Sequence, residues 1–421
     1  MAAPTDIVIT GIGVVSPVGV GRQAFWEAVA SGAGGIRPIT GFDASGLAVR
    51  FGGQIIDFDP KLCVRPRKSL KVMSRDIQLG FAAADLAVAD AALAAGAVEP
   101  GRFGVVFGGD MIYADIEDLE STYRLATAGG VFDYHRWAEA IQQEVHPLWL
   151  LKHLPNMTAS HVAIAHDARG PNNSIVLGDV SGLLAIAEAA SVIRRGWADV
   201  MIAGGTGCRL HPTAMVARGA AQLSHRGDDF ASACRPFDLH RDGLVNGEGA
   251  GAVILESREH AMRRGASIIG RILATSSRCE PRARHDGVSG AALRQAIRAA
   301  REAAGLEPRD VGHVNAHGLS TIEMDRAEAR AIVAELGDVP VTAPKSSFGH
   351  LGAGGGVVEM LASVLGLAAG IVPVTRSYRT PDPQCPVNVV HGVPLAGRPA
   401  TALAVNACST GQAVAVAVAA E

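Results

Sequence analysis

The feature that most constrains the fold of this chain is an order of elements that occurs twice along it. The repeated order is a strand, a glycine-rich turn, a helix and then a pair of strands. In the first half we expect these elements at residues 174–177, 178–182, 183–195, 199–203 and 250–256. In the second half we expect them at 341–343, 345–356, 357 onward, 401–406 and 412–419, with a further strand at 311–315. Two α/β halves of this kind predict layered sheets with helices between and outside them.

No linker rich in Pro, Gly or Ser and no block of like charge divides the chain. We therefore expect two halves of one fold, residues 1–258 and 259–421, with the boundary near 256–266. The apolar run at 6–15 predicts a buried opening strand. The first half is also expected to contain helices at 22–31 and 75–94 and a strand at 102–107.

The composition excludes several classes of function. The net charge of −3 provides no overall electrostatic attraction to nucleic acid or to an anionic membrane. The six cysteines have neither CxxC spacing nor His/Cys ligand spacing, so neither a disulfide framework nor a metal site is predicted. Residues 1–10 lack the pattern of a signal peptide. A reducing cytoplasm is the expected location.

The segment 352–374 is apolar except for Glu359 and is long enough to suggest a membrane span. Three consecutive glycines and Pro373 interrupt it. A helix enclosed between two sheets would also be apolar on all sides. We therefore predict a buried helix here and no membrane association.

Three turns carry residues suited to chemistry. Asp179 lies in the turn before the first-half helix, where unpaired backbone N–H groups stabilise an anion. The simpler interpretation makes Asp179 the N-cap of that helix. His317 follows an apolar strand, and Lys345 and His350 share one glycine-bounded turn. Histidine and lysine side chains at strand ends are suited to stabilising an enolate without a metal, although a structural role for each is also possible.

Motifs spread over the whole chain resemble the β-ketoacyl-[acyl carrier protein] synthase family. These motifs are IVITGIGVVSPVG from Ile7, PNM from Pro155, RPFDLHRDGLVNGEGAG from Arg235 and KSSFGHLGAG from Lys345. The resemblance implies the thiolase fold, an α/β architecture of five layers (αβαβα) with two similar halves. It also implies a dimer.

The resemblance assigns roles to individual residues. His317 and His350 match the two histidines that support decarboxylation of a malonyl thioester and bind the enolate oxygen. Lys345 matches the lysine that orders the site, and Glu328 matches its acidic partner. Asp179 occupies the position of the cysteine that accepts the acyl chain, so this chain is a divergent member.

Three further positions concern the phosphopantetheine arm. The carrier protein supplies this arm, so no other cofactor and no metal is expected. Thr321 keeps one of the family's contacts to this arm, whereas Leu319 stands where a second threonine is usual. Thr410 is the other expected contact. Cys408 precedes a strand and not a helix, so it lacks the helix N-terminus that activates a thiol, yet a reactive Cys408 remains an alternative.

Six basic residues lie close together between positions 61 and 75: Lys61, Arg65, Arg67, Lys68, Lys71 and Arg75. They form either a solvated surface or a docking patch for an acidic acyl carrier protein. The expected partners are that carrier protein and a second subunit, which makes either a homodimer or a heterodimer with a ketosynthase paralogue.

These residues support two main hypotheses within fatty acid or polyketide biosynthesis. The first is a malonyl-acyl carrier protein decarboxylase or related enzyme that uses His317, His350 and Lys345 without a covalent acyl intermediate. The second is a non-catalytic subunit that resembles a chain length factor and pairs with an active ketosynthase. A third interpretation makes Asp179 a general base for another acyl transfer or a hydrolysis. Because a carboxylate is a poor acyl acceptor, ordinary condensation is not expected.

Overall fold

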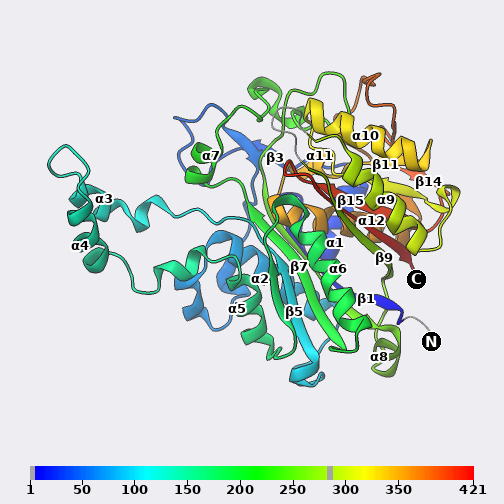
Figure 1. The fold of residues 1–421 in the computed structure, drawn as a ribbon, viewed down its shortest axis with the longest axis horizontal. Helices are drawn as coiled ribbons and strands as arrows, with labels where there is room; N and C mark the ends of the chain where they lie inside the picture. The colour runs from blue at the N-terminus through cyan, green and yellow to red at the C-terminus, as the bar shows by residue number, and fades with distance from the viewer. Residues whose placement is uncertain (1–4, 282–287) are drawn as a thin grey trace.

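The computed structural model describes residues 5–281 and 288–421 and has a large mixed β-sheet at its centre (Figure 1). Within the described residues the sheet has twelve strands in the order β13-β11-β10-β15-β16-β9-β1-β8-β7-β5-β6, with β2 (Gly19–Val20) paired to β1. The first-half strands are β1 (Ile7–Ser16), β5 (Phe103–Gly108), β6 (Asn172–Ile175), β7 (Val200–Cys208) and β8 (Glu248–Ser257). The second-half strands are β9 (Gly270–Cys279), β10 (His313–Asn315), β11 (Pro340–Thr342), β13 (Asn388–Val389), β15 (Thr401–Ala407) and β16 (Gln412–Ala420).

The two halves repeat the same strand order and directions. In the first half, β5 is parallel to β6 and β7, and β8 is antiparallel to β7 and β1. In the second half, β10 is parallel to β11 and β15, and β16 is antiparallel to β15 and β9. The halves meet at one seam, where Ile7, Val8 and Ile9 of β1 pair with β9. The duplication predicted from the sequence is therefore confirmed, although the seam makes the two expected sheets continuous.

Helices cover both faces of each half-sheet and produce five layers. The middle layer consists of α6 (Ser181–Arg194) and α12 (Gly355–Ala369), which contact strands of both halves. One outer layer contains α2 (Arg75–Asp90) and α5 (Met157–His166). The other contains α9 (Ala291–Ala303) and α10 (Ile322–Leu336), coloured yellow in Figure 1. The αβαβα arrangement expected from the sequence is thus confirmed.

The most apolar segment of the chain is the helix at the centre of the molecule. Residues Gly352–Ala369 are long and apolar enough to cross a membrane, but 83% of this window is buried inside the protein. Val357, Met360 and Leu361 of α12 belong to the same apolar cluster as Leu183 and Ile186 of α6. The prediction of a buried helix from 357 is confirmed, and the helix begins two residues earlier, at Gly355.

The two turns that precede α6 and α12 lie against each other because Gly182 has no side chain. A Cβ atom at Gly182 would lie 2.4 Å from the carbonyl oxygen of Ala353, far inside van der Waals contact. The turn that carries Asp179 and the turn that carries His350 can therefore approach only if residue 182 is glycine.

Replacing Gly182 with alanine is expected to lower the free energy of unfolding by about 1–3 kcal/mol, because a rigid backbone carbonyl must move. Chemical denaturation would measure the change. Gly46→Ala is the matched control, since a Cβ there meets nothing within 4 Å. Equal stability of the two variants would contradict the close packing of the turns.

Shorter elements complete the body and form an arm that projects from it. The body also contains α1 (Arg22–Ala30), α7 (Pro212–Arg218), α8 (Arg258–Arg263), α11 (Lys345–Phe348), β3 (Ile36–Pro38), β4 (Phe51–Gly53), β12 (Ile371–Val372) and β14 (Leu395–Ala396). The predicted boundary between the halves falls at the start of α8.

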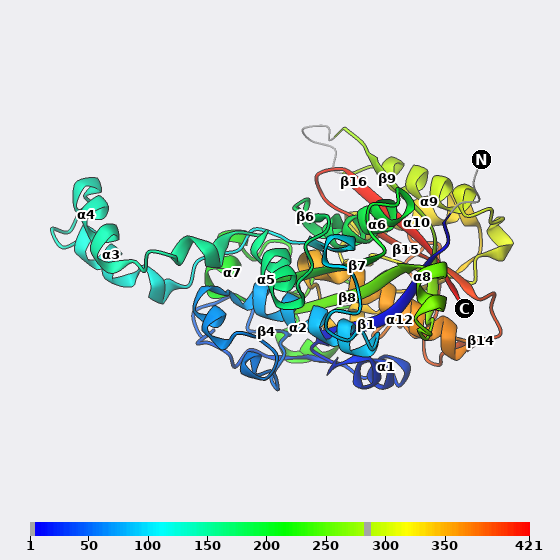
Figure 2. The same cartoon turned by 90° about the horizontal axis from the view of Figure 1, so that it is seen from below.

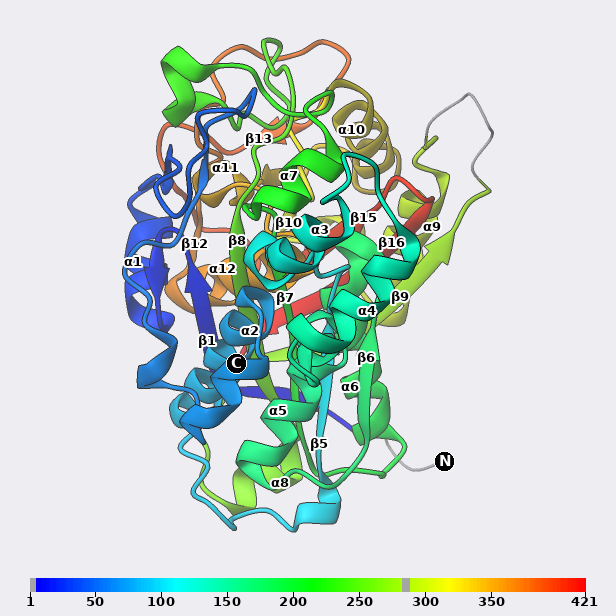
Figure 3. The ribbon, with the colours of Figure 1, turned by 90° about the vertical axis from the view of Figure 1, so that its left-hand side faces the viewer.

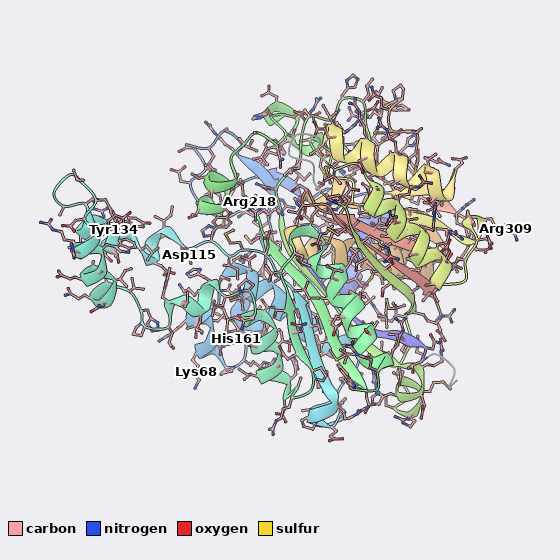
Figure 4. All side chains as sticks on the ribbon, in the orientation of Figure 1. Lys68, Asp115, Tyr134, His161, Arg218 and Arg309 are labelled. Atoms are coloured by element: carbon pink, nitrogen blue, oxygen red, sulfur yellow. The ribbon has the colours of Figure 1, made fainter. Side chains whose placement is uncertain are left out.

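The arm, residues 111–154, contains α3 (Glu120–Ala126) and α4 (Tyr134–Glu144) and extends far from the body (Figure 2). Figure 3 looks from the arm onto the body. At its tip, the Tyr123 and Trp137 rings are 4.6 Å apart and the Phe132 and Tyr134 rings 5.0 Å apart. Tyr134 is 79% exposed, so this aromatic cluster is only partly covered by its own chain (Figure 4).

Candidate active site

Asp179 lies between β6 and α6, in a short 3-10 turn formed by Gly178–Val180. Its side chain does not cap the helix, because the N-cap residue of α6 is Val180 and makes no side-chain cap bond. Ser181 closes the turn instead: its Oγ donates to the carbonyl of Gly178 and accepts from the amide of Leu177. The N-cap interpretation of Asp179 is therefore wrong, and its carboxylate is free to face the interior.

Two histidine side chains converge on this carboxylate. His350 Nε2 is 3.2 Å from Asp179 Oδ1, and His317 Nε2 is 3.7 Å from Asp179 Oδ2. The two imidazole centroids are 5.9 Å apart, with the rings nearly perpendicular. His317 follows β10, whereas His350 is held by a bond from its amide to the carbonyl of Val245. The structure thus brings together three residues singled out from the sequence.

Lys345 is buried at the start of α11, and its ammonium group donates to the carboxylate of Glu359 on α12. The expected pairing of Lys345 with Glu328 is therefore wrong. Glu328 instead accepts from the backbone amides of His317 at 2.7 Å and Gly318 at 2.8 Å. Its role is to fix the histidine loop. A sequence signal for the true partner existed, because Glu359 is the single charge in an apolar helix and a buried charge requires a counterion.

Arg209, which the sequence analysis did not identify, completes the charge balance of the site. Its Nη2 lies 2.6 Å from Asp179 Oδ1, at the end of β7. Burial alone would raise the pKa of Asp179, but the facing His350 side chain and the Arg209 guanidinium outweigh this and hold the pKa well below its usual range. Because Arg209 is a permanent cation, it keeps Asp179 ionised at neutral pH.

Both imidazoles are neutral at neutral pH. Burial, aided by the nearby Arg209 cation, lowers the pKa of His350 to about 3. Burial also lowers the pKa of His317, and the Lys345 ammonium group acts in the same direction. Because a carboxylate accepts hydrogen bonds, it favours the tautomer with the proton on the Nε2 atom that faces it. The neutral Nε2–H groups of His317 and His350 therefore both point toward the Asp179 carboxylate.

The ion pair of Asp179 predicts how stability depends on pH. A carboxyl whose pKa is lower in the folded protein than its usual value of 3.8 stabilises the fold above that value, and the contribution disappears as pH falls. We expect the difference in unfolding free energy between the wild type and Asp179→Asn to be largest near neutral pH. It should shrink below about pH 4. Denaturation curves at several pH values would measure it, and a difference that is constant from neutral to strongly acidic pH would contradict the ionised state.

A cavity of about 910 Å³ opens beside this group and is lined by Asp179, Arg209 and His350. Thr321 and Thr410, expected to contact a phosphopantetheine arm, line the same cavity. The hydroxyl of Thr321 is buried and has no hydrogen-bond partner among the described residues. No protein group among the described residues therefore competes for it.

Cys408 also lines the cavity, but its sulfur lies 2.7 Å from the hydroxyl of Thr410. In the described part of the chain, Thr410 is the hydrogen-bond partner of this thiol, and the imidazoles face Asp179 instead. Residues 5–281 and 288–421 contain no group of three ligand side chains that could hold a metal ion.

The six basic residues between 61 and 75 do not behave alike. Five are exposed, namely Lys61, Arg65, Arg67, Lys68 and Lys71, and Lys68 projects from the surface (Figure 4). Arg75 instead forms a bidentate pair with the buried Glu248, with Nε and Nη2 both 2.9 Å from its oxygens. Arg75 therefore has a structural role in the body.

Comparisons with known proteins find relatives along most of the chain. The family model described as Beta-ketoacyl synthase, N-terminal domain, matches residues 5–261, and the model of the corresponding C-terminal domain matches residues 269–379. A 3-oxoacyl-[acyl-carrier-protein] synthase 2 of Synechocystis sp. is 35% identical over 394 residues, which cover 92% of this chain and 91% of the relative.

Solved structures are similar along the whole chain. An ishigamide ketosynthase/chain length factor has a TM-score of 0.86 and 26% identity, with 100% of both chains covered. One chain in the structure of a type II PKS acyl-carrier protein in complex with its ketosynthase has a TM-score of 0.85 and 30% identity, again over 100% of both chains. Both the sequence and the fold of this chain are therefore similar to those of ketosynthases.

Proposed function

The chain belongs to the β-ketoacyl synthase family and has its thiolase fold, and we propose that it decarboxylates a malonyl thioester carried by an acyl carrier protein. The proposal includes no covalent acyl-enzyme. The resemblance of its turn to the family motif assigns Asp179 the position of the nucleophilic cysteine. An acyl group on a carboxylate would be an anhydride, which lies uphill from a thioester. Transfer of the acyl chain to residue 179, as ordinary condensation requires, is therefore not expected.

The reaction needs hydrogen-bond donors for an enolate oxygen, and His317 and His350 supply them. When the bond between the α-carbon and the carboxylate breaks, CO2 leaves and the electron pair of the broken bond passes into the enolate. The thioester oxygen then carries the negative charge and accepts from the two Nε2–H groups, with that of His350 released from Asp179. A proton from solvent at the α-carbon completes the acetyl thioester. The His317 Nε2 atom has no hydrogen-bond partner within the described residues, so no protein group competes with the enolate oxygen for its proton.

The observation that carries the proposal is the contact between Arg209 and Asp179. An unpaired carboxylate at the reaction centre would repel a malonyl carboxylate about 4 Å away by about 4 kcal/mol at an effective dielectric constant near 20. The Arg209 guanidinium lies 2.6 Å from Asp179 and neutralises it. A second carboxylate can therefore enter the cavity without that penalty.

The test is direct. Purified protein is incubated with malonyl-carrier protein, and mass spectrometry follows conversion of the malonyl group to an acetyl group while trapped CO2 is measured. We expect turnover of the carrier without any adduct on this chain. Conversion no faster than in a blank without enzyme would refute the decarboxylase, and an acyl adduct on any residue would refute the non-covalent route.

A second candidate function is a non-catalytic subunit that pairs with an active ketosynthase. The arm favours it, because residues 111–154 project from the body with an incompletely covered aromatic cluster. The outer edge of β6 is also unpaired within the described residues. An edge strand and exposed aromatic side chains are typical of a surface that another subunit covers.

Co-expression with a cysteine-bearing paralogue distinguishes the two functions. A stable heterodimer without CO2 release would support the structural subunit, whereas a homodimer with CO2 release would support the enzyme. In either assembly, the exposed lysines and arginines between 61 and 71 are proposed to attract the acidic carrier protein.

A further inference from the structure

A chain of four charged side chains extends from Asp179 along the wall of the cavity. Arg209 Nη2 lies 2.6 Å from Asp179 and 3.5 Å from Asp110, and Arg218 Nη2 lies 2.9 Å from Asp110. Arg209, Asp179 and Asp110 are each less than one-fifth exposed, whereas Arg218 is 30% exposed. All four line the cavity. The charges of these four residues balance, and the cavity is also lined by Asp242 and Glu323.

The three segments that carry this network are fixed by the fold. Asp110 follows β5, Arg209 follows β7 and Arg218 is the last residue of α7. Arg218 lies on the side of the body that faces the arm, with its guanidinium 5.7 Å from the ring centroid of Tyr113 (Figure 4). The fold therefore holds the network in place as part of the cavity wall.

The unused hydrogen-bonding groups of the network are donors. Asp110 Oδ1 accepts from the amide of Met111, and its Oδ2 accepts from Arg218. The Asp179 carboxylate accepts from Arg209 Nη2 and faces both imidazoles. By contrast, Arg209 Nε is buried and has no acceptor among the described residues. Each guanidinium has five N–H donors, so Arg218 also keeps donors that face the cavity.

Donors that lack acceptors select a ligand that brings oxygen. A keto, hydroxyl or carboxylate oxygen would satisfy the partly exposed Arg218, whereas a methylene group would exclude water from its donors and offer nothing in return. Met111, Val176 and Leu177 line the same cavity and provide contact for the hydrocarbon part of such a ligand. Sites built to hydrogen-bond a substrate reject an analogue that lacks the bonding group.

We propose that this cavity binds acyl groups that carry oxygen acceptors and discriminates against saturated alkyl chains. The inference rests on the proposed function, because it assumes that a carrier-bound acyl group enters beside Asp179. Arg218, as the most exposed member of the network, is the residue that contacts the oxygenated part of the acyl group.

Two pantetheine thioesters of equal length test the proposal: 4-oxopentanoyl-pantetheine and pentanoyl-pantetheine. They differ by one oxygen atom. Isothermal titration of the full chain would give both dissociation constants. We expect the 4-oxo compound to bind at least about tenfold more tightly, the effect of one hydrogen bond to a charged donor. In Arg218→Leu the ratio should fall below about threefold, while Arg169→Leu, at an exposed ion pair far from the cavity, should keep it.

Several results would overturn the proposal. These are equal or tighter binding of pentanoyl-pantetheine by the wild type, no binding of either compound, or a ratio that Arg218→Leu leaves unchanged. The wild-type comparison requires no variant, so misfolding of Arg218→Leu does not remove the test. CO2 release is measured on the same preparation. CO2 release without the preference for the 4-oxo compound would support the proposed reaction and refute the specificity. The preference without CO2 release would support the specificity and refute the proposed reaction.

Discussion

Replacing His350 with alanine is expected to reduce CO2 release from malonyl-carrier protein by about 10²–10³-fold, the usual effect of removing one donor to a developing oxyanion. His350 Nε2 faces the Asp179 carboxylate at 3.2 Å, and burial keeps the imidazole neutral by lowering its pKa to about 3. It therefore donates a hydrogen bond over the whole range in which the protein would be assayed. Because the donor acts on charge that develops in the transition state, kcat should fall while KM for the carrier changes little.

The control for this prediction is His135→Ala, which removes an exposed imidazole from α4 of the arm. It should release CO2 at the wild-type rate. A thermal scan of His350→Ala would show that the variant is folded. If folded His350→Ala kept more than about one-tenth of the wild-type rate, His350 would not stabilise the enolate, since even the low end of the expected effect is larger.

Replacing Arg209 with methionine is expected to lower the free energy of unfolding by about 3–5 kcal/mol, because Asp179 would be left as a buried charge without a permanent cation. The variant should also raise the pKa of Asp179, since Arg209 is one of the charges that now lower it. The double variant Arg209→Met/Asp179→Asn should recover much of the lost stability, because it removes both members of the pair. Urea denaturation of the four proteins forms a double-mutant cycle.

Arg102→Met is the matched control for the effect of burial. Arg102 lies 2.6 Å from Asp199, the same distance as in the Arg209 pair, but both side chains are about one-third exposed. Surface pairs of this kind contribute about 0–1 kcal/mol. Equal losses in Arg102→Met and Arg209→Met would show that the Arg209–Asp179 pair is hydrated and would weaken the account of the site.

The sequence predicted the architecture well because the repeated pattern is local. A strand, a glycine-rich turn and a helix each leave a signal within a few residues, and the same order occurs in both halves. The end of β7 was harder to predict. We expected a strand at 199–203, but it continues to Cys208 through Gly204, Gly205 and Gly207. These glycines resemble a turn in the sequence, yet their function is to admit neighbouring backbone: a Cβ at Gly207 would lie 2.3 Å from the carbonyl oxygen of Leu351.

The site was predicted in part. Asp179, His317 and His350 were identified and do lie together, because each follows a recognisable motif. The partner of Lys345 was misassigned, since the choice between Glu328 and Glu359 depends on the distance between helices and not on spacing along the chain. Arg209 was missed for the same reason: it is adjacent to no motif residue in sequence and meets Asp179 only when β7 and β6 are placed on either side of β5. The arm helices α3 and α4 were not anticipated either.

The middle layer has a further consequence. Since α6 comes from the first half and α12 from the second, and each packs on strands of both, neither half contains a complete core of its own. Removing either half would expose apolar surface of the other half to water and would separate Asp179 from both imidazoles. A substitution that disturbs the packing of either half, even far from the reaction centre, is therefore expected to shift α6 or α12 and with them the residues of the site.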